Sequence, residues 1–292
     1  MRRITLGNVT VDRVVEAEGL GFLPGFLLPD ATADLIAAED DWLEPHFFDP
    51  GSGRFIQSVH TFLVRTPRHT ILIDTCVGNH KQRPSTKAWH MQDTPFLARL
   101  AEAGVPPEAV DYVMCTHLHV DHVGWNTQLL DGRWVPTFPN AKYIFHKQEY
   151  DHWVAHGDYV TEGAGSSDAF FEDSVLPVVE AGQAQIVAGD FGLDDTVWLD
   201  PTPGHSPGHV CVRVASGGRE AVFSGDLLHH PVQCGRPDWN SRFCWDLEMS
   251  AATRKRFVEA QADKDVLVLP AHFAAPTVGR IVGAADGCRY VV

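Results

Sequence analysis

Long hydrophobic runs, paired cysteines and an excess of positive charge are all missing from this sequence. No apolar segment approaches the roughly 18 to 20 residues that a transmembrane helix needs, so we expect no membrane-spanning segment. The N-terminus has two arginines but no hydrophobic stretch of signal-peptide length, which predicts a mature cytoplasmic protein. The six cysteines are far apart and form no C-x-x-C pair, so we expect reduced, buried thiols and no disulfide framework.

The charge of the chain is strongly unbalanced. The 38 acidic residues outnumber the 23 basic residues, and the formal net charge is -15. Because an electronegative protein repels the phosphodiester backbone, the composition argues against nucleic acid as a partner. The expected partner is a small molecule that is neutral or weakly charged.

The composition that is present indicates a large folded domain. With 292 residues, 44% of them hydrophobic, the chain can bury a sizeable core. No linker rich in proline or serine divides it, so we predict a single domain over residues 1–292. Roughly ten or more short β-branched runs alternate with helical patterns along the whole length, which is typical of a layered α/β fold. Helices are predicted over residues 94–103, 147–154, 167–179 and 250–262, the last beginning with a serine cap.

Two loops have unusual compositions. Residues 19–30 read GLGFLPGFLLPD, which is apolar but interrupted by glycine and proline. This segment is either a packed connection or a hydrophobic lip that contacts substrate or a second subunit. Residues 78–94 are polar and locally basic, and they form either solvated surface or a substrate contact.

One stretch concentrates potential metal ligands. In CTHLHVDHVGW, His117, His119, Asp121 and His122 fall within six positions. His117 and His119 are two residues apart after an expected strand, so they can point the same way. Four ligands in so short a segment would crowd a single tetrahedral ion, and the spacing therefore favours two adjacent metal positions.

Three further candidates follow other expected strands. His205 lies in a turn rich in glycine and proline, and Asp226 and His272 each follow an apolar run. Each residue taken alone is more often a satisfied turn or core residue. Together with the first motif, they complete a set large enough for two metal ions.

The motifs THLHVDH, PTPGHSPGH, SGD and PAH, preceded by ILIDTCVG, resemble those of the metallo-β-lactamase superfamily over roughly residues 55–275. The resemblance implies a four-layer αββα sandwich with two mixed β-sheets. It also implies that one metal ion binds His117, His119 and His205, that a second binds Asp121, His122 and His272, and that Asp226 bridges the two. Asp74 would lie behind the ligands, where a carboxylate can orient an imidazole.

The implied metal pair has a clear chemical purpose. Two divalent ions, offset by Asp121, Asp226 and a bridging hydroxide, leave about one positive charge where an oxyanion would form. The ions also lower the pKa of bound water towards neutrality. Nitrogen and oxygen ligands suit two zinc ions per chain, although Mn, Co or Fe fits the same ligand types.

Departures from related patterns narrow the branch of the superfamily. His119 stands where flavodiiron relatives place a glutamate, and the full ligand set argues against true β-lactamases. The segment after Asp226 looks like the group of methyl parathion hydrolase and related lactone hydrolases. Acyl-homoserine lactonases carry a tyrosine three residues after the bridging aspartate, whereas this chain has His229. We expect His229, or its neighbour His230, to donate a hydrogen bond to the substrate oxygen.

The sequence therefore predicts a dinuclear zinc hydrolase. A metal-bridging hydroxide would attack the carbonyl of a lactone or ester, and Asp121 would return a proton to the leaving oxygen. The resemblance extends this to quorum quenching. The same metal geometry would let phosphotriesters (organophosphates) be hydrolysed as a side activity, and the apolar segment at residues 19–30 suggests a homodimer. The alternatives are a mononuclear iron dioxygenase acting on a sulfur substrate, a glyoxalase II-like thioesterase, and a metal-stabilised interaction protein.

Several other side chains have two interpretations each. Five aromatic residues are candidates for a pocket wall, of which about half should instead be core: Phe26, Trp125, Trp153, Trp239 and Phe273. Five histidines lack a motif and are expected at the surface or in structural positions: His46, His60, His90, His152 and His156. Three cations are either contacts for a carboxylate product or solvated surface residues: Lys81, Arg236 and Arg242.

Overall fold

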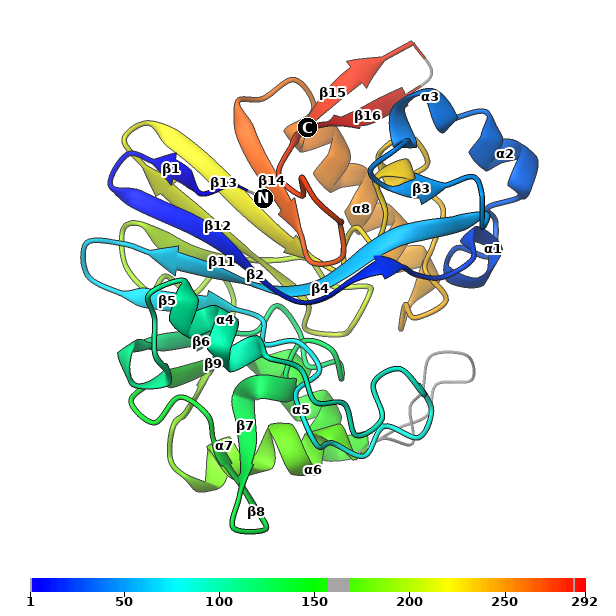
Figure 1. The fold of residues 1–292 in the computed structure, drawn as a ribbon. Helices are drawn as coiled ribbons and strands as arrows, with labels where there is room; N and C mark the ends of the chain where they lie inside the picture. The colour runs from blue at the N-terminus through cyan, green and yellow to red at the C-terminus, as the bar shows by residue number, and fades with distance from the viewer. Residues whose placement is uncertain (1, 157–168, 286) are drawn as a thin grey trace.

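The computed structural model describes residues 2–156, 169–285 and 287–292. In these residues most strands belong to two mixed sheets (Figure 1). The larger, eight-stranded sheet has the order β1-β2-β4-β5-β6-β9-β10, with β3 paired to β4. Its strands are β1 (Ile4–Leu6), β2 (Val9–Leu20), β3 (Phe48–Asp49), β4 (Arg54–Arg65), β5 (Thr70–Ile73), β6 (Tyr112–Met114), β9 (Lys142–His146) and β10 (Ala184–Val187).

The second sheet is smaller and carries much of the site. It has the order β11-β12-β13-β14 and consists of β11 (Val197–Pro201), β12 (Val210–Ser216), β13 (Arg219–Gly225) and β14 (Val266–Pro270). The first three strands are antiparallel, and β14 runs parallel to β13. Two separate hairpins, β7 (Thr127–Leu130) with β8 (Arg133–Pro136) and β15 (Arg280–Ala284) with β16 (Gly287–Val291), complete the described strands.

Helices cover the outer faces of both sheets. Figure 1 shows α4 (Phe96–Glu102), α5 (Lys147–His156), α6 (Phe170–Ser174) and α7 (Leu176–Glu180) on one side of the molecule, and α8 (Leu247–Gln261) on the other. Three short helices, α1 (Pro24–Leu27), α2 (Ala33–Ala37) and α3 (Asp40–Leu43), contribute side chains to the same apolar cluster as α8. Short 3-10 turns are η1 (Pro107–Ala109), η2 (Gly124–Asn126) and η3 (Pro231–Cys234).

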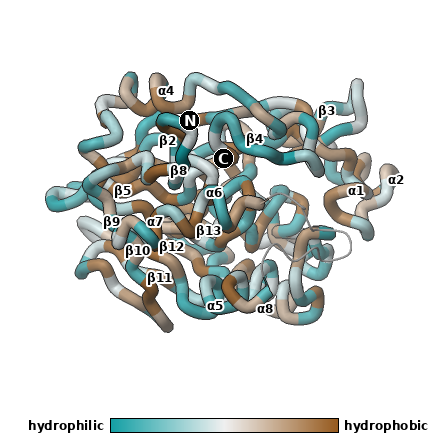
Figure 2. Tube along the Cα trace, turned by 90° about the horizontal axis from the view of Figure 1, so that it is seen from below, coloured by the Kyte–Doolittle hydropathy of each residue, from teal (hydrophilic) through white to brown (hydrophobic). Residues whose placement is uncertain are grey.

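Three apolar clusters separate these layers. The cluster between the sheets joins residues such as Phe62 of β4 to Phe223 of β13. On its outer face the larger sheet packs against Phe96 of α4, whereas the smaller sheet packs against Phe257 of α8. Figure 2 shows hydrophobic residues along the interior strands and at α1. Two mixed sheets between two layers of helices confirm the predicted αββα fold class.

Two predicted helices differ from those observed. The helix predicted from Ser250 begins earlier, at Leu247, because the Asp246 carboxylate accepts a hydrogen bond of 2.9 Å from the Met249 amide and serves as the cap. The helix predicted over 167–179 is divided into α6 and α7, and its first two residues lie outside the described residues. Pro177 lacks the amide hydrogen that a continuous helix would donate to the Asp173 carbonyl, which accounts for the break at Val175.

The predictions about thiols and membranes can be compared directly with the structure. All six cysteines are free, and all except the half-buried Cys288 are buried. Among the described residues, no helix has both the length and the hydrophobicity needed to span a bilayer.

The fold brings four strand ends to one edge of the sandwich. The loops that follow β6, β11, β13 and β14 contain His117 to His122, His205, Asp226 and His272 respectively. Because these strands lie in two sheets that pack face to face, residues more than 150 positions apart in the chain meet at this edge. The predicted ligands therefore share one location.

The packing between the sheets gives a first prediction. Phe223 is 1% exposed and its ring lies 5.1 Å from that of Phe62, so Phe223→Ala should leave a cavity and cost about 3 to 5 kcal/mol of unfolding free energy. Urea denaturation of the metal-free protein measures this loss. The control is Leu130→Ala, at a position 57% exposed in β7, which should change stability by less than about 0.5 kcal/mol. Equal effects of the two substitutions would contradict the proposed core.

Candidate metal centre

Seven side chains converge at the edge of the sandwich in two adjacent groups. The first group contains His117, His119, His205 and Asp226, and the second contains Asp121, His122 and His272. Within each group the nitrogen and oxygen atoms that face inward lie within 4.8 Å of one another. The structure thus brings together every residue that the sequence suggested as a metal ligand.

The first group places three imidazole nitrogens against one another. His205 Nε2 lies 2.9 Å from His119 Nδ1 and 3.2 Å from His117 Nε2. Zinc–nitrogen bonds of 2.0 to 2.1 Å in a tetrahedral site would place two ligand nitrogens about 3.3 Å apart. Neutral nitrogens pointing their lone pairs at each other repel unless a proton or a cation lies between them. The observed spacing is therefore that of a cation site.

Asp226 connects the two groups. Its Oδ2 lies 3.3 Å from His205 Nε2, and its Oδ1 lies 3.0 Å from His272 Nε2 and 3.2 Å from His122 Nε2. Asp121 contributes to the second group at longer distances, 3.5 Å from His272 and 3.7 Å from His122. One oxygen of Asp226 thus faces each group, which is the geometry of a bridging carboxylate.

Asp74 orients two of the imidazoles. Its Oδ2 accepts a hydrogen bond of 2.9 Å from His122 Nδ1, which leaves His122 Nε2 free to face the site. The Thr116 hydroxyl donates to the same carboxylate and lies 3.1 Å from His117 Nδ1, from which its oxygen can accept. Asp74 therefore fixes the tautomer of one histidine directly and of the other through a hydroxyl. This is the place that the resemblance predicted for Asp74.

His209 is a supporting residue that the sequence analysis did not select. Its Nε2 accepts a hydrogen bond of 3.1 Å from the Asp226 amide, and its Nδ1 lies 2.8 Å from the Thr202 hydroxyl. Burial lowers the pKa of His209 to about 4, so the ring is neutral and can accept. Gly225 has φ of +48°, and a Cβ at this position would lie 2.7 Å from His209 Nε2. The second histidine of PGHSPGH was the available signal.

The donor set satisfies the requirements of a divalent cation site. Five imidazoles and two carboxylates supply the nitrogen and oxygen ligands that zinc and similar ions prefer. His122 Nε2 and Asp226 Oδ1 are buried and lie 3.2 Å apart, but neither makes a hydrogen bond of good geometry. Buried polar atoms without a partner are costly, and a bound cation would satisfy both.

Electrostatics differ between the two groups. Burial lowers the pKa of His272, but Asp226 and Asp121 outweigh burial and raise this pKa to about 9. Burial also opposes protonation of His122, whose pKa is nevertheless held well above the usual range by Asp226 and Asp74. In the first group, burial lowers the pKa of His117 and His205 well below the usual value. The metal-free second group therefore holds protons at neutral pH, and the first group does not.

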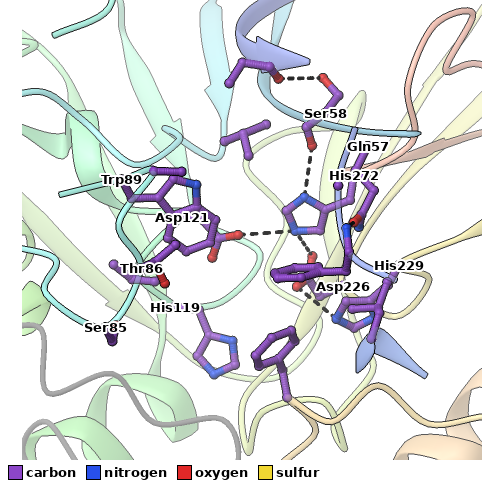
Figure 3. Close-up of a pocket in the computed structure, with 18 of the residues that line it drawn as sticks. Gln57, Ser58, Ser85, Thr86, Trp89, His119, Asp121, Asp226, His229 and His272 are labelled. Atoms are coloured by element: carbon purple, nitrogen blue, oxygen red, sulfur yellow. Dashed lines mark hydrogen bonds and ion pairs between the residues drawn. The ribbon is translucent and has the colours of Figure 1, made fainter. Parts of the chain in front are cut away.

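A cavity of about 890 Å³ opens above these residues. Figure 3 shows His119, Asp121, Asp226, His229 and His272 around a common space. Both loops of unusual composition contribute to its walls: residues 19–22 and 26–27 on one side, and residues 85–89 on the other. This arrangement favours the substrate-contact interpretation of each loop.

The structure distinguishes His229 from His230. His229 lines the cavity, and its Nε2 lies 3.2 Å from Asp226 Oδ2. His230 points away, because its Nε2 bonds to the carbonyl of Phe47 at 2.9 Å and its ring stacks on Phe55 at 3.6 Å. His229 is therefore the neighbour of the site, and His230 is part of the core.

The other candidates fall into two classes. Phe26 and Trp153 line the cavity, whereas Trp125, Trp239 and Phe273 are packed in the core. His46, His90 and His156 are exposed and His60 is buried against Ser58, but His152 lines the cavity, contrary to expectation.

Neither interpretation of Lys81 was correct. Lys81 is fully buried. Its ammonium group donates a hydrogen bond of 2.8 Å to the Thr127 hydroxyl and forms an ion pair with Asp173, so this part of the loop packs into the protein. Of the other two cations, Arg236 pairs with Glu39 and Arg242 lies 4.0 Å over the ring of Phe26.

Comparison with known proteins agrees with this geometry. The family model for the metallo-beta-lactamase superfamily matches residues 55–272. The N-acyl homoserine lactonase of Bacillus cereus is 28% identical over 162 residues, covering 52% of this chain and 56% of the relative. The lactonase AttM of Agrobacterium fabrum is 32% identical over 123 residues, covering 40% of this chain and 41% of the relative. The chain thus aligns with about half the length of these curated relatives.

Solved structures share the fold. AidC, a dizinc quorum-quenching lactonase solved with a product, superposes with a TM-score of 0.77 at 20% identity, covering 99% of this chain and 96% of that one. The hydrolase AbOPH of the β-lactamase superfamily superposes with a TM-score of 0.78 at 23% identity, covering 99% of this chain and 96% of that one. At these identities the comparisons establish the fold alone.

The charge state of the second group predicts proton release on metal binding. Below their raised pKa values, His122 and His272 are protonated, and both must lose a proton to coordinate. Zinc titrated into chelator-treated protein at pH 7 should therefore release about two protons from these rings, measured by calorimetry in buffers of different ionisation enthalpy. Release should fall as the pH passes about 9, where His272 loses its proton unaided. His272→Ala should release about one proton fewer, and identical release by both proteins would contradict this assignment.

Proposed function

Because the chain belongs to the metallo-β-lactamase superfamily, we propose that it is a metal-dependent hydrolase that opens lactones or cleaves related esters. The observation that supports this most strongly is Asp226, whose two oxygens face two histidine groups beneath one cavity. The lactonase relatives support the same substrate class. The proposal includes zinc as the metal, with Asp226 as the bridge between two ions.

The residues of the site would divide the work as follows. A pair of divalent cations supplies deprotonated water at neutral pH and an electrophile for the substrate's oxygen. His117, His119 and His205 would hold one cation, and Asp121, His122 and His272 the other. Asp121 also lines the cavity, where its carboxylate can carry a proton to the leaving oxygen.

His229 is placed to act on the substrate directly. It lines the cavity with its Nε2 3.2 Å from Asp226 Oδ2, and its Nδ1 has no hydrogen-bond partner. Burial lowers the pKa of His229, so the ring is neutral at pH 7 and carries one N–H. That N–H can donate a hydrogen bond to the carbonyl oxygen and to the negative charge that develops on it.

The cavity wall favours a substrate with an apolar portion. Phe22 and Phe26 stack with ring centroids 5.0 Å apart, and Phe243 lies 5.8 Å from Phe22. These three rings and Trp245 line the cavity together with polar residues at 85–87. A lactone or ester with an apolar substituent matches this mixture, because the rings bury the substituent while the polar floor receives the reacting group.

The dioxygenase alternative has less support than a hydrolase, and the thioesterase alternative is decided by the substrate. A mononuclear iron dioxygenase would need one ligand group, whereas Asp226 contacts two groups with separate oxygens. Phosphotriesters remain a proposed side activity, because the site recognises a polarised oxygen more than a carbon centre. The wider proposal keeps one domain over residues 1–292, a cytoplasmic location and a homodimer.

A substrate screen tests the proposed function. Zinc-loaded protein is assayed with a pH indicator against lactones, aryl esters, thioesters and phosphotriesters, while bound metal and oxygen uptake are measured in parallel. We expect two zinc ions per chain, lactone hydrolysis and no oxygen uptake. The control is Asp226→Ala, which should lower kcat by about 1,000-fold or more and reduce bound zinc. Iron with oxygen uptake, or full activity in the variant, would overturn the proposal.

The contrast between two neighbouring histidines gives a sharper test. His229→Ala should lower kcat/KM for lactones by about 100-fold while both metal ions remain bound, because one donor to the developing oxyanion is lost. His230→Gln should lower the melting temperature, since His230 is packed against Phe55, but leave kcat/KM close to that of the unchanged protein. Kinetics and metal analysis of the two variants measure this difference. The opposite pattern would show that His230 is the substrate contact.

A further inference from the structure

A buried glutamate on α5 contacts both loops that contain the first ligand group. Glu149 is 1% exposed and lies in the first turn of α5. Its Oε1 accepts a hydrogen bond of 3.0 Å from the Leu118 amide, between His117 and His119. Its Oε2 accepts one of 2.9 Å from the Gly208 amide, three residues after His205. One carboxylate therefore joins two loops that are about 90 positions apart in the chain.

The same carboxylate also acts through its own helix. Trp153, one turn further along α5, donates from Nε1 to Glu149 Oε1 at 2.9 Å. The Trp153 ring meets the His119 ring edge to face, with centroids 5.8 Å apart. Glu149 thus fixes the backbone before His119 and also holds the aromatic ring against which His119 packs.

The sequence around Gly208 is adapted to this contact. A Cβ at position 208 would lie 2.1 Å from the Glu149 amide nitrogen and 2.7 Å from its Cα. Such distances are far below van der Waals contact, so only glycine allows this loop to reach α5. The glycine permits the close approach, and the carboxylate then bonds the amide that it exposes.

We propose that Glu149 is a positioning residue that holds the loops of His117, His119 and His205 in the geometry needed to bind the first cation. The arrangement is a single buried acceptor with three donors, two of them main-chain amides of different loops. Hydrogen bonds to a charged carboxylate are stronger than neutral ones. Residues that orient metal ligands typically change metal affinity by about 10-fold to 100-fold when substituted. The proposal rests on the proposed function only in taking these histidines as metal ligands.

The chain contains a matched control for this residue. Glu16 is 4% exposed and also accepts two main-chain amide bonds, from Val77 at 2.9 Å and Gly78 at 3.1 Å. It too accepts a tryptophan N–H, from Trp125 at 2.6 Å. The loop that Glu16 holds contains none of the seven candidate ligands. Loss of either carboxylate should destabilise the protein to a similar degree.

The test compares Glu149→Gln with Glu16→Gln by metal binding without any substrate. Cobalt(II) binding to chelator-treated protein, followed by its visible spectrum and by metal analysis, should show about 10-fold weaker binding of one of two ions in Glu149→Gln. Glu16→Gln should bind both ions as the unchanged protein does. Unchanged cobalt binding in Glu149→Gln, or equal losses in the two variants, would overturn the proposal.

Amide hydrogen exchange of the metal-free proteins gives a second readout. Glu149→Gln should speed amide exchange at Leu118 or Gly208 by about 10-fold, because the glutamine side chain retains only one acceptor oxygen. Glu16→Gln should instead speed amide exchange at Val77 or Gly78. Exchange unchanged at both Leu118 and Gly208 would refute the role of Glu149. If Glu149→Gln does not fold, Glu149→Asp replaces it, since it keeps the charge but is one methylene too short to reach both loops. An unchanged protein that binds no metal would refute the proposed function, and the exchange data would still decide whether Glu149 holds both loops.

Discussion

The structure of the site depends on the close approach of several histidine nitrogens and carboxylate oxygens around Asp226. Five imidazoles and two carboxylates meet at one edge of the sandwich in two adjacent groups, and within each group the ligand atoms lie within 4.8 Å of one another. Lone pairs directed at a common point repel, and burial removes the water that would screen them. Such an arrangement persists only when the surrounding structure enforces it and a cation or protons relieve it. The raised pKa of His272 and the lowered pKa of Asp226 show that protons provide this relief in the metal-free protein, because the attraction between imidazolium and carboxylate outweighs the burial that opposes each charge.

The enforcement comes from groups outside the seven candidate ligands. Asp74 orients His122 directly and His117 through Thr116, and His209 holds the amide of Asp226. Glu149 joins the loop that contains His117 and His119 to the loop that contains His205. Asp74, His209 and Glu149 are all buried. Removing each of them from water costs free energy, and their hydrogen bonds offset that cost. Supporting groups of this cost are expected where geometry, more than stability, is being maintained.

The cavity above the ligands places chemistry and recognition in one space. Its floor is polar, and its walls include the aromatic rings of Phe22 and Phe26 from the apolar segment and of Phe243 and Trp245, which follow Asp226 in the chain. The polar floor suits an ester or lactone group, and the walls suit an apolar substituent. His229 lines this cavity beside Asp226, whose Oδ2 lies 3.2 Å from its Nε2.

The sequence by itself identified the candidate ligands and the layered α/β class from local patterns, and the family resemblance supplied the four-layer sandwich and the division of the ligands into two groups. Histidine and aspartate spacing after apolar runs is visible in the chain, and so are alternating strands and helices. Tertiary structure alone decided which of His229 and His230 faces the cavity, since adjacent residues of an irregular segment have no fixed direction. It also decided that Phe26, Trp153 and His152 line the cavity while Trp125 is core, and that Lys81 is buried beside Asp173. The role of Glu149 was equally invisible, because its partners are main-chain amides that any residue possesses. Such contacts do not restrict which residue occupies a position, except at Gly208, where the approach of α5 leaves no room for a side chain.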